Sequence, residues 1–230
     1  MIILEKHLGV EVLRDDLLPG GTKSVLMPSI IGSNSEYVYA SPVYGGFQIA
    51  LASYCQQANK KATIFCAKRK KRHANTIKLI ELGASVIEVE YGYLSVIEKR
   101  AREYCEKTGA EKLVFGANTE YNKNILTKRV IEVLNELKRE PEEIWCAIGS
   151  GTLVEAILKA TKTAKIYGVQ VGKDYKQEHP RLTVLKYHKS FEMESNFKSS
   201  FPSMPNYDLK AFEYCIKYKK TDNVLFWNVL

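Results

Sequence analysis

Apolar positions along the chain follow two patterns, a short continuous run and a helical repeat, which take turns from one end to the other. Residues 61–67 (Lys-Ala-Thr-Ile-Phe-Cys-Ala) are a short apolar run with β-forming side chains, which predicts a buried strand. In residues 75–82 the apolar side chains recur at helical spacing, and Gly83 stands where a helix would end.

The same two patterns continue to the C-terminal part of the chain. They predict strands over residues 84–89, 113–115, 144–148, 165–171 and 224–227, and helices over 94–107, 122–137, 152–160 and 207–218. Regular alternation of strands and helices is typical of parallel sheets covered on both faces. In such α/β folds ligands bind at the carboxyl ends of strands, so the turns that follow strands are where chemistry is expected.

Composition is that of an ordinary globular protein, with 230 residues, 45% of them hydrophobic and 26% charged. No apolar stretch approaches the ~20 residues that span a bilayer, and the early charges do not fit a signal peptide, so we expect no membrane association and a cytoplasmic location. Five cysteines without a C-x-x-C spacing favour reduced thiols. Four scattered histidines give no indication of a metal site.

The net charge is +8, and its densest part is residues 68–73 (Lys-Arg-Lys-Lys-Arg-His). Two interpretations stay open. The run is either a solvated loop and helix start beside a site for an anionic cofactor, or a surface that contacts the phosphates of nucleic acid.

A glycine-rich turn separates the predicted strand 144–148 from the helix that follows. Gly149, Ser150, Gly151 and Thr152 would bring backbone N–H groups and two hydroxyls to a helix start, an arrangement that suits a phosphate. No lysine follows the second glycine, so the turn is not a P-loop, and Val154 breaks the dinucleotide pattern. A tight turn without a ligand remains the alternative.

Near the start, residues 18–23 (Leu-Pro-Gly-Gly-Thr-Lys) form a turn that ends in a lysine. Desolvation lowers the pKa of a lysine, and a neutral amine is what a Schiff base requires. By itself the pattern also fits a surface lysine.

Together these segments resemble the fold-type-II pyridoxal-phosphate enzymes, and most nearly the D-cysteine desulfhydrase and aminocyclopropane-carboxylate deaminase group. Residues 20–23 are similar to the Gly-Gly-Asn-Lys segment of that group, which carries the Schiff-base lysine. Residues 41–52 stand in the place of its polar loop and Gln-x-Ala-x-Ala helix. Residues 149–152 are similar to its phosphate loop, Gly-Ser-Gly-Gly-Thr.

The resemblance continues through a later strand (residues 167–172) and the last helix and strand (207–211 and 224–228). It implies an α/β fold of the tryptophan synthase beta type, with two three-layer αβα lobes and mostly parallel sheets. Residues 1–35 and 119–230 would form the larger lobe, which binds the cofactor phosphate, and residues 36–118 the smaller lobe. A homodimer is usual in this group.

The site residues follow from the same resemblance. Pyridoxal 5'-phosphate would be held by Lys23, by the turn at residues 149–152, and by Asn228 near the pyridine nitrogen. Lys23 and Tyr44 would be catalytic, with Lys23 transferring protons. The substrate would meet Ser41, Tyr44, Gly45, Gly46 and Gln48. Tyr44 replaces an Asn of the group, and Asn228 stands where its last strand has Thr-Gly-Gly.

The expected function is that of a lyase or deaminase acting on an amino acid or amine, by elimination or replacement. The basic charge extends this to an aminoacyl group carried by a nucleotide or DNA. One alternative is a non-catalytic nucleotide- or nucleic-acid-binding protein on the same fold. A phosphoribosyltransferase is disfavoured because no paired acidic residues precede a Thr-Gly loop.

Overall fold

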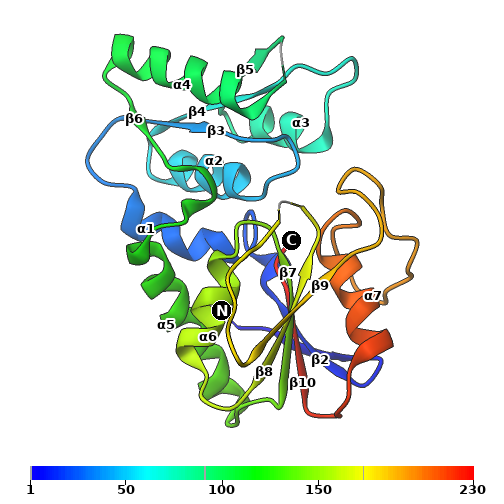
Figure 1. Ribbon diagram of the computed structural model, residues 1–230. Coiled ribbons are helices and arrows are strands. Elements are labelled where there is room, and N and C mark those ends of the chain that lie inside the picture. Colours follow the sequence, from blue (N-terminus) through cyan, green and yellow to red (C-terminus); the bar gives the residue numbers. More distant parts are fainter. Residues whose placement is uncertain (1, 91, 173) are drawn as a thin grey trace. The chain divides into compact units, whose positions relative to one another are not determined.

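The computed structural model describes residues 2–90, 92–172 and 174–230, and the chain divides into two compact units. The first unit comprises Met1–Leu18 and Asn118–Leu230, and the second comprises Pro19–Ala117. The division expected from the sequence placed residues 19–35 with the first unit, whereas their contacts group them with the second. Figure 1 shows the elements of both units.

The first unit is a twisted sheet with helices on both faces (Figure 1). Its strand order is β1-β2-β10-β7-β8-β9, and β1 is antiparallel to its neighbour whereas the other pairs are parallel. Helix α7 packs on one face, and α6 packs on the other with α5 beside it. The described strands and α-helices of this unit are β1 Leu4–His7, β2 Val10–Arg14, α5 Glu120–Leu137, β7 Glu143–Ile148, α6 Thr152–Ala160, β8 Lys165–Gln170, β9 Leu182–Lys186, α7 Asp208–Tyr218 and β10 Val224–Asn228.

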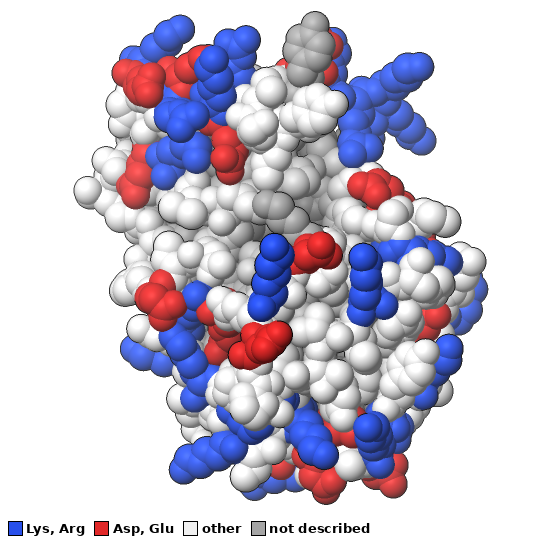
Figure 2. Space-filling model, viewed as in Figure 1, with Lys and Arg blue, Asp and Glu red and all other residues white. Residues whose placement is uncertain are grey.

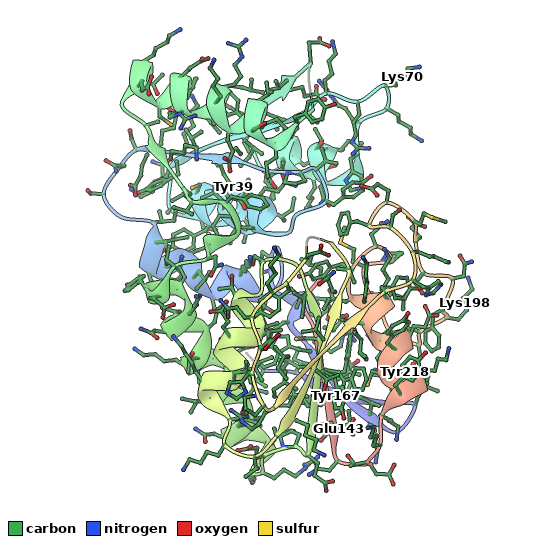
Figure 3. All side chains as sticks on the ribbon, in the orientation of Figure 1. Tyr39, Lys70, Glu143, Tyr167, Lys198 and Tyr218 are labelled. Atoms are coloured by element: carbon green, nitrogen blue, oxygen red, sulfur yellow. The ribbon has the colours of Figure 1, made fainter. Side chains whose placement is uncertain are left out.

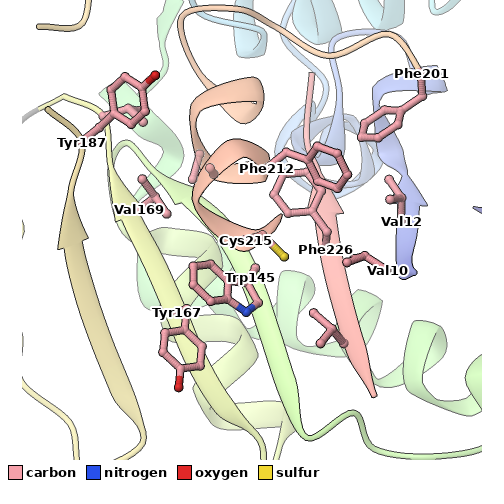
Figure 4. Packing of buried hydrophobic residues seen from close by; sticks show 14 residues of the cluster. Val10, Val12, Trp145, Tyr167, Val169, Tyr187, Phe201, Phe212, Cys215 and Phe226 are labelled. Carbon is pink, nitrogen blue, oxygen red and sulfur yellow. The ribbon is translucent and has the colours of Figure 1, made fainter. Parts of the chain in front are cut away.

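Aromatic side chains fill the space between this sheet and α7 (Figure 4). Phe212 of α7 meets the ring of Phe226 on β10 edge to face, with 5.0 Å between ring centroids. On the adjacent strands Trp145 stacks on Tyr167 at 4.3 Å. Burying such rings removes a large apolar area from water, and this packing fixes the strands whose carboxyl ends carry the predicted phosphate turn.

The second unit is a smaller parallel sheet in the order β5-β4-β3-β6. Helix α4 covers one face, and α2 and α3 cover the other (Figure 1). Its described elements are α1 Met27–Ile30, β3 Glu36–Ala40, α2 Phe47–Gln57, β4 Lys61–Ala67, α3 Ala74–Glu81, β5 Ser85–Val89, α4 Leu94–Thr108 and β6 Glu111–Lys112, with short 3-10 turns at Thr22–Leu26 and Phe115–Ala117.

Most elements expected from the sequence are present within one or two residues of their predicted ends. The strand expected over residues 113–115 is wrong. The strand β6 is the pair Glu111–Lys112, and Phe115–Ala117 forms a 3-10 turn. The reason is local, because Gly116 and Ala117 both have positive φ angles, +72° and +54°, which turn the backbone out of the sheet direction.

Candidate functional site

The turn before Lys23 lies against the first turn of α2 within the second unit. Gly20 has φ +81°, and a Cβ atom placed there would stand 2.3 Å from the backbone nitrogen of Ala50 and 2.5 Å from the carbonyl oxygen of Gly46. Neither backbone atom can move away, so only glycine allows this approach. The turn therefore brings the segment that carries Lys23 next to the loop that leads into α2.

The amine of Lys23 lies in surroundings poor in water. Its Nζ donates a hydrogen bond to the carbonyl oxygen of Gly116, at 2.6 Å. The N–H of Gly116 in turn donates to the hydroxyl of Tyr39, at 3.1 Å (Tyr39 is labelled in Figure 3). Desolvation lowers the pKa of Lys23 to about 8, from an ordinary value of 10.5. A much larger share of the amine is therefore neutral near pH 7 than for a solvated lysine.

The loop between β3 and α2 carries the other predicted residues of the second unit. Gln48 holds it from inside, because its Nε2 donates to the carbonyl oxygen of Val43 at 2.8 Å. The Oε1 atom of Gln48 is buried and has no hydrogen-bond partner among the described residues. Ser41 is buried, and its hydroxyl donates to the carbonyl of Pro42 at 2.8 Å. Gly45 lies so close to Ser41 that a Cβ atom at Gly45 would be 3.0 Å from Ser41 Oγ.

Tyr44 lies at the outer side of this loop. Its ring meets the ring of His73, which follows β4, at 4.8 Å between centroids and nearly edge to face. Gly46 ends the loop at the start of α2, and its carbonyl accepts the amide of Ala50 at 3.1 Å. The carboxyl ends of two neighbouring strands thus meet at Tyr44, the edge at which α/β folds bind ligands.

In the first unit, residues 149–152 form the expected turn between β7 and α6. Gly151 has φ +82° and precedes the helix, and the hydroxyls of Ser150 and Thr152 lie 2.8 Å apart. The first turn of a helix leaves N–H groups without carbonyl partners in the helix, and they favour an anion.

Two tyrosine rings pack on this turn. A Cβ at Gly151 would stand 2.2 Å from the ring of Tyr175, and one at Gly149 would stand 2.7 Å from the hydroxyl oxygen of Tyr207. A larger residue at Gly151 would therefore displace Tyr175 even where no phosphate binds.

Asn228 ends β10 and is completely buried. Both ends of its amide are engaged: Oδ1 accepts from Ser203 Oγ at 2.7 Å, and Nδ2 donates to the carbonyl of Pro202 at 3.0 Å. These bonds tie the segment before α7 to β10.

Asp208, at the start of α7, is a residue that the sequence analysis did not single out. Its Oδ2 accepts the amide of Leu230 at 2.8 Å, whereas its Oδ1 is buried without a partner among the described residues. Desolvation raises the pKa of this carboxyl well above its ordinary value. The neighbouring Tyr207 reaches the glycine turn, so Asp208 belongs to the same edge of the sheet. The sequence offered one signal for this residue, because Asp208 is an acidic residue within the segment 207–211 that resembles the family's last helix.

The structure therefore forms two groups from the predicted residues. Lys23 lies with the loop of Ser41–Gln48 in the second unit. In the first unit, the turn at residues 149–152 follows β7, and Asn228 ends the neighbouring strand β10. The Oδ1 of Asp208, which has no partner among the described residues, and the hydroxyls at the turn fit a ligand with a phosphate and a basic ring nitrogen. Among the described residues there is no cluster of three side chains able to hold a metal ion.

An open groove of about 500 Å³ lies between β5 and α4, with Phe65, Ile87 and Val96 in its wall, and it contains none of the predicted site residues. No described helix is both long enough and apolar enough to cross a membrane.

A family model described as "Pyridoxal-phosphate dependent enzyme" matches residues 12–194. The chain belongs to this family. The expectations of an enzyme and of pyridoxal phosphate as its cofactor are thereby confirmed. No curated protein sequence matches the chain.

Solved structures support the family's fold. An ACC deaminase homologue superposes with a TM-score of 0.78 at 14% identity, over 96% of this chain and 85% of that one. A hydrogen sulfide-producing enzyme from Fusobacterium nucleatum gives 0.73 at 15% identity, over 100% and 94%. O-acetylserine sulfhydrylase isoform 3 from Entamoeba histolytica gives 0.72 at 11%, over 100% and 84%. The predicted fold-type-II α/β fold, with two three-layer units, is confirmed.

Proposed function

We propose that this pyridoxal-phosphate-dependent enzyme acts on an amino acid or another amine-bearing substrate, by elimination, replacement or deamination. The observation that carries the proposal is the amine of Lys23, which a glycine turn places in desolvated surroundings beside the Ser41–Gln48 loop. A neutral amine is the form that attacks a carbonyl group. Two of the similar solved structures are named as an ACC deaminase homologue and an O-acetylserine sulfhydrylase, and these names are consistent with this substrate class.

The turn in the first unit would hold the cofactor phosphate. The backbone N–H groups at the start of α6 lack carbonyl partners within the helix and would bind the phosphate, and Ser150 and Thr152 add hydroxyl donors. When bound, the cofactor supplies an electron sink for negative charge that develops on the substrate.

Asp208 is the residue we propose for the pyridine nitrogen, in preference to Asn228. The Asp208 Oδ1 atom is buried and unpaired among the described residues, whereas both amide atoms of Asn228 are already bonded. Burial raises the pKa of this carboxyl well above its ordinary value, so the carboxyl can share a proton with a basic nitrogen. Asn228 then acts by positioning the segment before α7.

On the side of the second unit, Lys23 would accept and return a proton once its amine is released, as a general base. The loop of Ser41, Tyr44, Gly45, Gly46 and Gln48 would bind the carboxylate of the substrate. Gln48 supports that loop through Val43 and keeps a buried acceptor, Oε1, for an N–H of the bound ligand.

Reductive trapping tests this function. The protein, incubated with pyridoxal phosphate and treated with borohydride, should gain the mass of the reduced cofactor on the peptide that contains Lys23. Lys99 is the matched control, since it is an exposed lysine of the same unit. Label on Lys99 with none on Lys23 would contradict the assignment. No label anywhere would favour a binding protein without catalysis.

The positive charge supports a finer proposal, that the reacting amine is carried by a nucleotide or DNA. The other finer proposals are a cytoplasmic location and a homodimer. All five cysteines are free thiols, which supports a reducing compartment. The homodimer rests on the family resemblance alone.

A further inference from the structure

Residues 68–73, which we call the basic loop, follow β4 and carry cations with different interaction partners. At its two ends, Lys68 pairs with Glu90, and Arg72 pairs with Glu88 at 2.7 Å. Arg69 instead places its guanidinium over the ring of Tyr44, 5.0 Å from the centroid, and has no carboxylate partner among the described residues. An aromatic ring orients a guanidinium without neutralising its charge, so Arg69 stays able to bind an anion.

His73 closes the same cluster from the other side of Tyr44. Its Nδ1 accepts the amide N–H of Asn75, and this bond caps α3. In the neutral ring the proton is then on Nε2, which makes that nitrogen a donor. The side chain of Asn75, in the first turn of α3, also donates to the carbonyl of Val43 at 3.0 Å, so the helix start that follows the basic loop is bonded to the proposed substrate loop.

Positive charge is densest along the chain in this loop. Elsewhere in the second unit some described cations have acidic partners, as Lys61 has Glu36 and Arg100 has Glu103. In Figure 2, Lys and Arg side chains project together from one corner of this unit, and Figure 3 labels Lys70 there. A guanidinium held close to a histidine within one loop can bind a single phosphate group, whether that group is free or part of a larger molecule.

We propose that Arg69, Tyr44 and His73 form a specificity site for a phosphate group on the side chain of the substrate. The site rests on the proposed function, because the substrate loop that supplies Tyr44 is the one assigned to the substrate carboxylate. Arg69 supplies the paired N–H donors that match phosphate oxygens, and His73 Nε2 supplies one more. The enzyme accordingly prefers an amino acid that carries a phosphate over the same amino acid without it.

The first test is independent of any reaction. The titration of His73 is followed by NMR in the holoenzyme, with and without inorganic phosphate. Bound phosphate should raise the pKa of His73, and the R69Q variant should abolish that rise. The R72Q variant is the matched control: it removes the same charge from the same loop, but its partner is Glu88, so it should keep the rise. A rise that persists in R69Q, or no rise in the unaltered protein, overturns the proposal.

The second test compares O-phospho-L-serine with L-serine, through the concentration that half-saturates the change in cofactor absorbance. Phosphoserine should bind at least about tenfold more tightly, and R69Q should remove that preference while R72Q keeps it within about twofold. Equal weakening of both ligands in R69Q, or binding of a DNA oligonucleotide that R69Q and R72Q reduce alike, overturns the proposal. A protein without cofactor absorbance fails the proposed function instead, and the histidine titration still decides this site.

Discussion

The two units carry ionisable groups of opposite kind at the carboxyl ends of their strands, and burial acts on them in opposite directions. In the second unit, desolvation lowers the pKa of the Lys23 amine to about 8. In the first unit, desolvation raises the pKa of the Asp208 carboxyl well above its ordinary value. Both groups are shifted toward their neutral forms, one as a base able to accept a proton and the other as an acid able to give one.

The comparison also separates two ways of building a site. The lysine segment depends on one backbone contact, at Gly20, whereas the turn at residues 149–152 is packed under the rings of Tyr175 and Tyr207. Substitutions in the second unit should therefore act through placement of the amine. Substitutions in the first unit should act through affinity for the cofactor.

The largest effect is expected when the amine itself is removed. Lys23→Ala should lower kcat by about 10²–10⁴-fold, the usual contribution of a positioned general base, and should abolish trapping of the cofactor. Lys99→Ala should change neither, because that side chain lies on the exposed face of α4. Steady-state rates with a turned-over amino acid, read beside the trapped mass, provide the measurement. Full activity in Lys23→Ala would refute the role of this amine.

Gly20→Ala should break the second unit's half of the site by moving the turn. The added Cβ meets backbone atoms of Ala50 and Gly46, and the residue must also keep φ +81°. We expect a loss of ~3 kcal/mol in unfolding free energy. Gly83→Ala is the control, since Gly83 has a similar φ, +76°, and open space around it, and should cost only ~1 kcal/mol. Denaturant unfolding compares the two, and equal losses would show that the contact with α2 is unimportant.

Asp208→Asn tests the first unit's half. The amide keeps the shape of the side chain but cannot hold the shared proton, so the affinity for pyridoxal phosphate should fall by about 10–100-fold. Asn228→Ala should reduce stability, through the lost bonds to Ser203 and Pro202, and leave that affinity nearly unchanged. Absorbance titration of the apoprotein measures both. A larger loss in Asn228→Ala than in Asp208→Asn would return the nitrogen role to Asn228.

Smaller changes are expected from the hydroxyls of the phosphate turn. Ser150→Ala and Thr152→Val should each weaken cofactor binding by about tenfold, or ~1.4 kcal/mol, since each removes one hydrogen bond to a charged group. They are preferable to a bulky residue at Gly151, which would collide with Tyr175 whether or not phosphate binds. Control titrations with pyridoxal, which lacks the phosphate, should show no difference between these variants and the unaltered protein.

Much of the fold could be predicted because the sequences of buried parallel strands are short, continuous runs of apolar residues. Strands β4 and β7 are of this kind, with nearly every residue buried. Strands β1, β2, β3 and β9 were not predicted. Of these, β9 lies at a sheet edge, is only partly buried and mixes polar with apolar side chains. The false strand at residues 113–115 shows the opposite error, since three apolar side chains precede a backbone turn that only Gly116 reveals.

The sequence points to candidate site residues where a reactive side chain and glycines lie together in a short stretch, as at Lys23 and at the 149–152 turn. Asp208 was not, because one acid at a helix start usually favours the helix dipole and is solvated. Only tertiary packing shows that this carboxyl is buried with one oxygen unpaired among the described residues. The packing of the Tyr175 ring on Gly151 is likewise a contact between residues distant in the sequence, and the residues around Gly151 do not predict it.

The smallest expected effect is the pH dependence of cofactor attachment, which tests whether burial lowers the pKa of the Lys23 amine. With a pKa of about 8, roughly a tenth of the Lys23 amine is neutral at pH 7 and about half at pH 8. The initial rate of cofactor attachment to the apoprotein should therefore rise about fivefold between these pH values and level off above pH 9. A lysine at the ordinary pKa of 10.5 would instead give a tenfold rise in rate per pH unit up to pH 10.

The lowered pKa of Lys23 also makes the unfolding free energy depend on pH, and the direction of that dependence follows from the shift. Between about pH 8 and 10.5 the unfolded chain retains a proton on Lys23 that the folded chain has lost, so unfolding free energy should increase with pH across that window. Lys23→Met should remove this contribution, and a slope unchanged in that variant would assign it to other groups.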